Sequence, residues 1–173
     1  MEIKKIVTGA LDENCYVLIE NKEALVIDPG DDYLNIKEAI GDNKILGVLI
    51  THSHFDHIGA LDELLNYYHV KVNEYEKLPN MKVIKSPGHT KDSVSYYFPE
   101  FNVIFCGDFI FKDAFGRLDL GGNAKDMLHS LEKLEKYDKK IHLYPGHGES
   151  STLEKEISNF NDYKQYIKNL TKM

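Results

Sequence analysis

The chain has 173 residues, 42% hydrophobic and 28% charged, which is typical of an ordinary globular domain and excludes a disordered or fibrous chain. Its formal net charge of −7, with no block of lysine or arginine, argues against a general nucleic-acid surface. The N-terminal segment lacks the apolar core of a signal peptide, and no apolar run is long enough to cross a bilayer. We therefore expect a cytoplasmic protein of one domain that binds neither nucleic acid nor membrane.

Short apolar runs alternate with turn signals in the N-terminal part of the chain. The predicted elements are, in order, strands at Ile3–Val7, Asn14–Ile19 and Ala24–Ile27, a helix at Tyr33–Ile40, a strand at Ile45–Ile50 and a helix at about Ala60–Tyr68. Leu11–Asp12–Glu13 is interpreted as a turn.

The C-terminal part continues the mixture of strands and helices. It predicts strands at Val70–Asn73 and Met81–Ile84, a hairpin of Ser93–Phe98 and Asn102–Cys106, a loop at Phe109–Asn123, a helix from Asp126 to about Lys136 and a strand at Ile141–Tyr144. The tail from Leu153 predicts one broken helix or two consecutive helices. No internal repeat or linker is evident, so one α/β domain is expected.

Four ligand-type side chains are concentrated in the stretch Thr51–Gly59, which follows a predicted strand: His52, His54, Asp56 and His57. His52 and His54, two apart on an extended segment, can point the same way, whereas Asp56 and His57 lie past a bend. The alternative is a solvated polar loop, but four such residues within six are not expected from a chain with eight histidines. The stretch therefore predicts a metal loop, and its ligands suit zinc and also iron or manganese.

Three further ligand-type residues share one sequence context: His89, Asp108 and His147 each follow an apolar strand and a glycine-containing turn. With the metal loop they make seven ligands, five histidines and two aspartates. Two metal ions with three ligands each and one shared carboxylate require seven. The sequence therefore indicates a binuclear site with an open position for water.

These motifs together resemble the metallo-β-lactamase fold superfamily. The matching residues are His52–Ser53–His54–Phe55–Asp56–His57 for the H-x-H-x-D-H signature, then Gly88–His89–Thr90, Gly107–Asp108 and Gly146–His147–Gly148 in the family's order. The similarity also includes Asn14–Cys15–Tyr16 and Asp28–Pro29–Gly30, and it is closest to the small hydroxyacylglutathione hydrolase (glyoxalase II)-like hydrolases. It implies an αββα sandwich of two facing mixed sheets flanked by helices, with residues 1–173 as a single domain.

The resemblance also implies how the ligands are sorted and what they do. One metal ion takes His52, His54 and His89, the second takes Asp56, His57 and His147, and Asp108 bridges them. Two divalent ions, expected to be zinc, activate a bridging hydroxide that cleaves a thioester or a related acyl substrate. Asp56 and Asp108 are the implied catalytic residues, because they position this hydroxide.

The substrate is left open by the tail of the chain. Full-length glyoxalase II enzymes carry a C-terminal helical region that grips glutathione, and only residues 148–173 follow His147 here. We therefore expect this region to be missing and the substrate to be some small-molecule thioester or acyl compound. Arg117, in an element resembling G-R-x-D, either recognises a substrate carboxylate or pairs with Asp119. Asp28 either supports a ligand histidine or is only a turn residue.

Two alternative functions are compatible with the same motifs. Persulfide dioxygenases resemble them too, but use a single iron, for which His52, His89 and Asp108 would be the ligands. A non-catalytic relative is the other alternative, but such a protein is expected to have lost ligands.

The sequence does not indicate an oligomeric state, and the two separated cysteines, Cys15 and Cys106, are expected to be reduced and buried.

Overall fold

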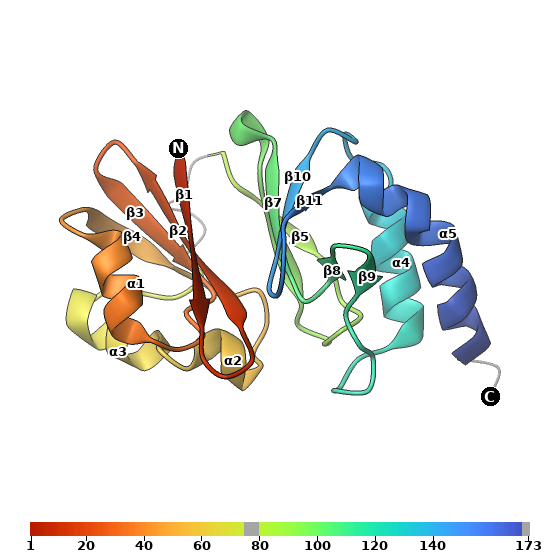
Figure 1. Ribbon diagram of the computed structural model, residues 1–173, viewed down its shortest axis with the longest axis horizontal. Coiled ribbons are helices and arrows are strands. Elements are labelled where there is room, and N and C mark those ends of the chain that lie inside the picture. The colour runs from red at the N-terminus through yellow and green to blue at the C-terminus, as the bar shows by residue number, and fades with distance from the viewer. Residues whose placement is uncertain (75–79, 171–173) are drawn as a thin grey trace. The chain divides into compact units, whose positions relative to one another are not determined.

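The computed structural model describes residues 1–74 and 80–170, and the chain divides after Met81 into two compact units. Each unit contains one mixed β-sheet and the helices that cover it, as Figure 1 shows for each unit.

The first unit is built on a four-stranded sheet with the strand order β1-β2-β3-β4. Its strands are β1 (Glu2–Thr8), β2 (Glu13–Glu20), β3 (Glu23–Ile27) and β4 (Lys44–Leu49). The first three are antiparallel neighbours, whereas β4 runs parallel to β3. A parallel pair requires a crossover connection, and helix α1 (Tyr33–Ile40) provides it. The carboxyl ends of β3 and β4 therefore lie side by side.

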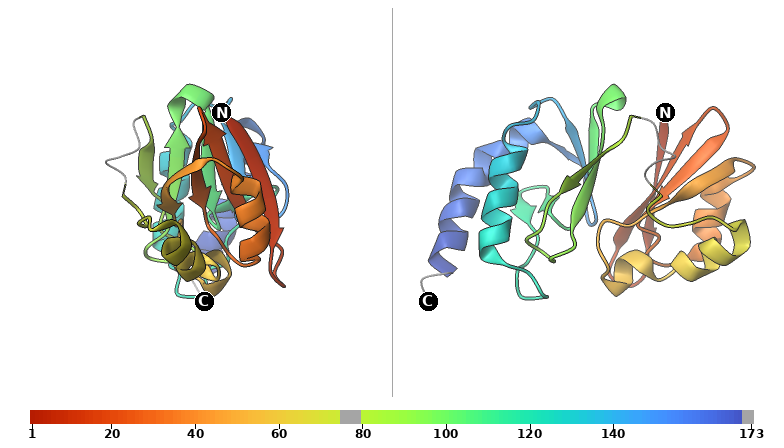
Figure 2. Two further views of the ribbon diagram at one scale, coloured as in Figure 1. Left: turned by 90° about the vertical axis from the view of Figure 1, so that its left-hand side faces the viewer. Right: turned by 180° about the vertical axis from the view of Figure 1, so that it is seen from behind.

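Two helices, α1 and α3 (Leu61–Tyr68), cover one face of this sheet, as Figures 1 and 2 show. Ile36 and Ile40 of α1 and Leu64 of α3 are fully buried, and they pack in one cluster with apolar residues of the strands. The short helix α2 (Phe55–Ile58) lies between β4 and α3 in the chain, within the predicted metal loop.

The second unit is built on a five-stranded sheet with the strand order β11-β10-β7-β6-β5. Its strands are β5 (Lys82–Lys85), β6 (Val94–Phe98), β7 (Val103–Gly107), β10 (His142–Pro145) and β11 (Ser151–Thr152). A 3-10 turn, η2 (Pro99–Phe101), connects the antiparallel pair β6 and β7. The strands β7 and β10 are parallel, so the residues that follow them leave the sheet at the same edge.

Helices α4 (Ala124–Leu134) and α5 (Leu153–Leu170) cover one face of the second sheet (Figures 1 and 2). The Asn123 side chain caps α4 by accepting hydrogen bonds from the Lys125 and Asp126 amides. On α5, Leu153, Phe160 and Ile167 are buried and seven residues apart, so one stripe of the helix enters the core.

Most predicted elements are confirmed within one or two residues, and four predictions are wrong. Val70–Asn73 forms no strand and contributes only an isolated bridge between Val72 and Val48. The predicted loop Phe109–Asn123 contains a two-stranded hairpin, β8 (Ile110–Phe111) and β9 (Ala114–Phe115). From Leu153 to Leu170 the tail forms one helix, α5. Glu13, interpreted as a turn residue, is the first residue of β2.

The packing of α5 provides a test of this core. Phe160→Ala is expected to lower the free energy of unfolding by about 3–5 kcal/mol, because a fully buried ring leaves a cavity. Leu170→Ala, at a position 43% exposed on the same helix, is the control and should change stability by less than about 0.5 kcal/mol. Urea denaturation of both variants measures the difference, and an equal effect would contradict the packing of α5.

None of the helices within residues 1–74 and 80–170 combines the length and apolar character that a bilayer-spanning segment needs.

Candidate metal centre

Four of the seven predicted ligands lie in the first unit, in the segment that follows β4. His52 and His57 are buried, whereas His54 and Asp56 are partly exposed. The Nε2 atom of His52 lies 3.1 Å from Nδ1 of His54. Two imidazole nitrogens bound to one tetrahedral zinc ion at about 2.0–2.1 Å would lie about 3.3 Å apart, so this spacing fits two ligands of one ion.

Asp56 and His57 form a second pair on α2, as predicted from their position past the bend. An Asp56 carboxylate oxygen, Oδ2, lies 3.9 Å from Nε2 of His57. Within the first loop His52 thus contacts His54, and Asp56 contacts His57, while the rings of His52 and His57 also lie close together, with their centroids 4.1 Å apart. The contacts of His52 with His54 and of Asp56 with His57 are compatible with the allocation that the family resemblance implies, which stays a prediction.

Asp28 orients the buried histidines of this loop. It follows β3, and because β3 and β4 are parallel neighbours it lies beside Thr51, which follows β4. Its carboxylate accepts hydrogen bonds from the Thr51 amide and the Thr51 hydroxyl, each at 2.6 Å, and contacts Nδ1 of His57 at 3.0 Å. The carboxylate thus favours the tautomer with hydrogen on Nδ1, which presents Nε2 to a metal ion.

Thr51 extends this support to His52. Since its hydroxyl hydrogen is donated to Asp28, the hydroxyl oxygen can accept a hydrogen bond from Nδ1 of His52, 3.1 Å away. This arrangement favours the same tautomer in His52 as in His57. Of the two interpretations of Asp28, the structure shows the contact with a predicted ligand histidine, His57. The Asp28 backbone has a left-handed φ of 50°, which is strained for a residue other than glycine.

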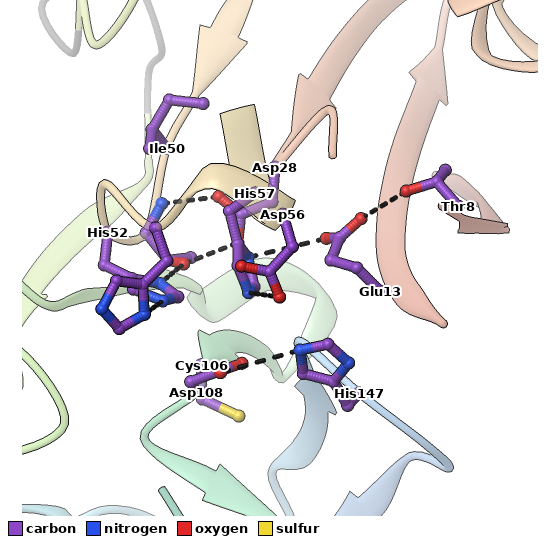
Figure 3. A network of polar contacts seen from close by, with 12 residues as sticks. Thr8, Glu13, Asp28, Ile50, His52, Asp56, His57, Cys106, Asp108 and His147 are labelled. Carbon is purple, nitrogen blue, oxygen red and sulfur yellow. Dashed lines mark hydrogen bonds and ion pairs between the residues drawn. The ribbon is translucent and has the colours of Figure 1, made fainter. Parts of the chain in front are cut away.

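Glu13 is a residue of this cluster that the sequence interpretation missed. Its side chain is buried, its Oε2 accepts a hydrogen bond from the Thr8 hydroxyl at 2.8 Å, and its Oε1 lies 3.6 Å from Nδ1 of His57. Figure 3 shows Thr8, Glu13 and His57 joined by these contacts. Burial, and then the nearby Asp28 carboxylate, raise the pKa of Glu13 to about 9. The only sequence signal for it is a charged residue that begins an apolar strand.

The other three predicted ligands lie in the second unit, each after a strand. His89 follows β5, Asp108 follows β7 and His147 follows β10. A single carboxylate oxygen, Oδ2 of Asp108, lies 3.5 Å from Nε2 of His89 and 3.7 Å from Nε2 of His147. Figure 3 shows the contact between Asp108 and His147. One carboxylate that faces two imidazoles is the arrangement that a bridging ligand requires.

The main chain of Arg117 orients His89. Its carbonyl oxygen lies 2.7 Å from Nδ1 of His89. Because a carbonyl oxygen can only accept, Nδ1 must carry the hydrogen and Nε2 is the nitrogen available to a metal ion.

The Arg117 side chain instead forms two hydrogen bonds with the Asp119 carboxylate, on a surface where both side chains are exposed. This pairing holds the pKa of Asp119 down, to about 2. Of the two predicted roles of this side chain, the pairing with Asp119 is therefore present in the structure.

Two glycines allow the close packing behind the ligands. A Cβ atom at Gly30 would lie 2.0 Å from the Asp56 carbonyl oxygen, and one at Gly116 would lie 1.8 Å from the Asp108 carbonyl oxygen. Both distances are far below van der Waals contact, so only glycine fits without movement of the ligand-bearing backbone.

The two cysteines are buried free thiols, and Cys106, next to Gly107, donates to the Ile110 carbonyl.

The donor set in each unit fits divalent metal ions. It consists of imidazole nitrogens whose opposite nitrogen is engaged by the protein, together with carboxylate oxygens, which are ligands that zinc, iron and manganese all accept.

Comparisons with known proteins agree with this donor set. The model of a family described as "Metallo-beta-lactamase superfamily" matches residues 8–78 and 74–147. The "Probable metallo-hydrolase YqgX" of Bacillus subtilis (strain 168) is 28% identical over 191 residues, which cover 86% of this chain and 90% of that protein. A "Hydroxyacylglutathione hydrolase" of Ectopseudomonas mendocina (strain ymp) is 32% identical over 149 residues. That match covers 72% of this chain and only 58% of the relative.

Two solved structures share the fold. The crystal structure of the BLEG-1 B3 metallo-beta-lactamase superposes with a TM-score of 0.83 at 28% identity, covering 91% of this chain and 97% of that one. The crystal structure of TTHA1623 in a di-iron-bound form gives a TM-score of 0.80 at 28% identity, covering 88% of this chain and 96% of that one.

Proposed function

The chain belongs to the metallo-beta-lactamase superfamily, and from this premise we propose that it is a metal-dependent hydrolase that cleaves a thioester or a related acyl substrate. Its α/β fold of two mixed sheets flanked by helices is that of the superfamily. We propose further that residues 1–173 act as a single metallo-β-lactamase-like domain, in which the ligands of both units bind the same pair of ions.

The single observation that carries a two-metal site is the position of Asp108. One of its carboxylate oxygens faces both His89 and His147, which belong to different proposed ions. A carboxylate oxygen near one imidazole of each proposed ion can be shared between the two ions. The pairing of His52 with His54, and of Asp56 with His57, supports the same division.

The proposed assignment uses all seven ligands. His52, His54 and His89 hold one ion, Asp56, His57 and His147 hold the other, and Asp108 is shared. We propose zinc as the ion, with iron and manganese as alternatives; a structural relative of this chain has been crystallised in a di-iron-bound form.

When bound, the metal ions supply a water nucleophile that is ionised near neutral pH and an electrophile for the substrate carbonyl. The protein contributes fixed geometry. Asp28 and the Arg117 carbonyl hold His57 and His89 in one tautomer, so these ligands need no reorganisation. Asp56 and Asp108, the proposed catalytic carboxylates, orient the nucleophile. A thiolate leaves readily, so cleavage of a thioester requires no additional acid residue.

The proposed substrate class comes from the hydroxyacylglutathione hydrolase relatives. The match to the Ectopseudomonas mendocina relative covers 58% of that protein. We propose a small-molecule thioester and do not assign glutathione as its thiol. Arg117 is a weaker candidate for a substrate contact, because a substrate carboxylate would have to compete with Asp119 for its guanidinium group. We also propose a cytoplasmic location, which the two free, buried cysteines support.

The test is hydrolysis of a panel of thioesters, including S-lactoylglutathione, by protein whose metal content has been measured. We expect about two ions per chain, thioester hydrolysis, and loss of activity after chelation that added zinc, iron or manganese restores. One iron per chain together with oxygen uptake on glutathione persulfide would overturn the hydrolase and favour the dioxygenase. Metal-loaded protein that hydrolyses no member of a thioester and lactone panel would favour a non-catalytic role.

A further inference from the structure

We propose that Glu13 is a positioning residue for His57: the carboxyl groups of Glu13 and Asp28 together hold the Nδ1 edge of the His57 ring, so that Nε2 is presented to a metal ion. The inference rests on the proposed function for the role of His57 as a ligand. The orientation of the ring itself can be measured without metal.

The first support for this proposal is the burial of Glu13. Its side chain is 1% exposed, yet it is not part of an ion pair with lysine or arginine among the described residues. Its Oε2 is engaged by the Thr8 hydroxyl, and Oε1 has no hydrogen-bond partner within residues 1–74 and 80–170. Buried carboxyl oxygens are rarely left in this state, so a functional reason for it is expected.

The second support is the direction in which the unpaired oxygen points. Glu13 Oε1 lies 3.6 Å from Nδ1 of His57, and Asp28 Oδ2 lies 3.0 Å from the same nitrogen. A carboxyl oxygen can accept a hydrogen bond whether or not the group is ionised, so two such oxygens beside one ring nitrogen favour a hydrogen on that nitrogen. Asp28 Oδ2 also accepts the Thr51 hydroxyl, so its hold on His57 is shared, and Glu13 restricts the ring further.

The third support is the space that the neighbouring backbone leaves for Glu13. A Cβ atom at Gly30 would lie 2.4 Å from Glu13 Oε2 and 2.8 Å from the Thr8 hydroxyl oxygen. Gly30 follows Asp28 by two residues, so the segment that supplies the Asp28 carboxylate also makes room for the Glu13 carboxyl. The two carboxyl groups are thus packed as one arrangement around His57.

The test uses Glu13→Gln, which keeps the size of the side chain. Its amide oxygen can accept from Thr8, which turns the amide NH₂ toward His57 and disfavours hydrogen on Nδ1. The matched control is Glu156→Gln, in the second unit, because Glu156 is also fully buried and accepts from Ser151 and from the Asp113 amide. The control measures what the loss of any buried carboxylate does to the fold.

The first measurement is ¹⁵N NMR of the histidine rings in metal-free protein, with His57 identified by the signals missing in His57→Asn. We expect a single tautomer with hydrogen on Nδ1 in the unmodified chain and in Glu156→Gln, and a reduced population of this tautomer in Glu13→Gln, in which Asp28 still contacts Nδ1. An unchanged tautomer in Glu13→Gln would overturn the proposal.

The second measurement is zinc affinity by competition with a chromogenic chelator. We expect Glu13→Gln to weaken the binding of one of the two ions by about tenfold or more, and Glu156→Gln to change it by less than about twofold. Equal affinities in the two variants would also overturn the proposal. If the unmodified chain binds no zinc, iron or manganese, the proposed function fails, while the tautomer still decides the role of Glu13.

A third variant keeps the test valid if Glu13→Gln does not fold. Thr8→Val removes the hydroxyl that anchors Oε2 and leaves the Glu13 carboxyl in place. We expect it to reduce the population of the Nδ1 tautomer of His57, by less than Glu13→Gln would. A tautomer unaffected by the loss of the Thr8 anchor would count against Glu13.

Discussion

Replacing His54 with alanine is expected to abolish hydrolysis while leaving the fold largely intact. His54 is partly exposed and its ring nitrogen faces His52, so its removal takes a ligand from the proposed ion and leaves no large cavity in the core. We expect zinc affinity to fall by about 100-fold or more, which corresponds to about 2.7 kcal/mol. Activity assays at fixed metal concentration, together with circular dichroism, would measure both effects.

The control for His54 is another histidine that lies far from the predicted motifs in the sequence. His129 is exposed on α4, so His129→Ala should retain activity and metal content. Full activity in His54→Ala would contradict its assignment as a ligand. A parallel loss of activity in His129→Ala would indicate that alanine at any histidine perturbs the protein.

Gly116→Ala is expected to have the second large effect, although Gly116 has no side chain that could bind a metal ion. An added Cβ would lie 1.8 Å from the Asp108 carbonyl oxygen and 3.0 Å from Cβ of His89. The backbone must therefore move at two proposed ligands, and we expect a loss of about 1–3 kcal/mol of stability together with reduced metal binding. Thermal unfolding of the metal-free variant and zinc titration would separate the two effects.

Gly121→Ala, at a second glycine of the segment between β9 and α4, is the matched control. Its Cβ would contact nothing within 4 Å, but its φ of +94° is unfavourable for alanine. We expect a moderate loss of stability with unchanged metal affinity. If Gly121→Ala reduced metal binding as much as Gly116→Ala, the close packing on Asp108 would not be the cause.

The wrong predictions from sequence have identifiable causes. The tail was expected to be one broken helix or two consecutive helices, but it contains no glycine or proline between Leu153 and Leu170, and its buried apolar residues recur every seven positions on one stripe. The segment Val70–Asn73 has β-forming residues, but Val72 makes only a bridge to Val48 at the edge of the sheet. The hairpin of β8 and β9 has two residues in each strand, which is too short for alternation to be recognised.

The family and the candidate metal ligands of this chain can be recognised from the sequence alone. The seven ligand-type residues are identifiable because their side chains and their spacing after apolar strands are local properties, and the family follows from the same motifs. The groups that orient the candidate ligands are visible only in the folded chain. Asp28 reaches His57 because β3 and β4 are parallel neighbours, and the Arg117 carbonyl reaches His89 across 28 positions of the chain. Glu13, too, is distinguished from an ordinary turn residue only by its burial beside His57. Such contacts depend on which segments of the folded chain pack together, and sequence spacing carries no signal for them.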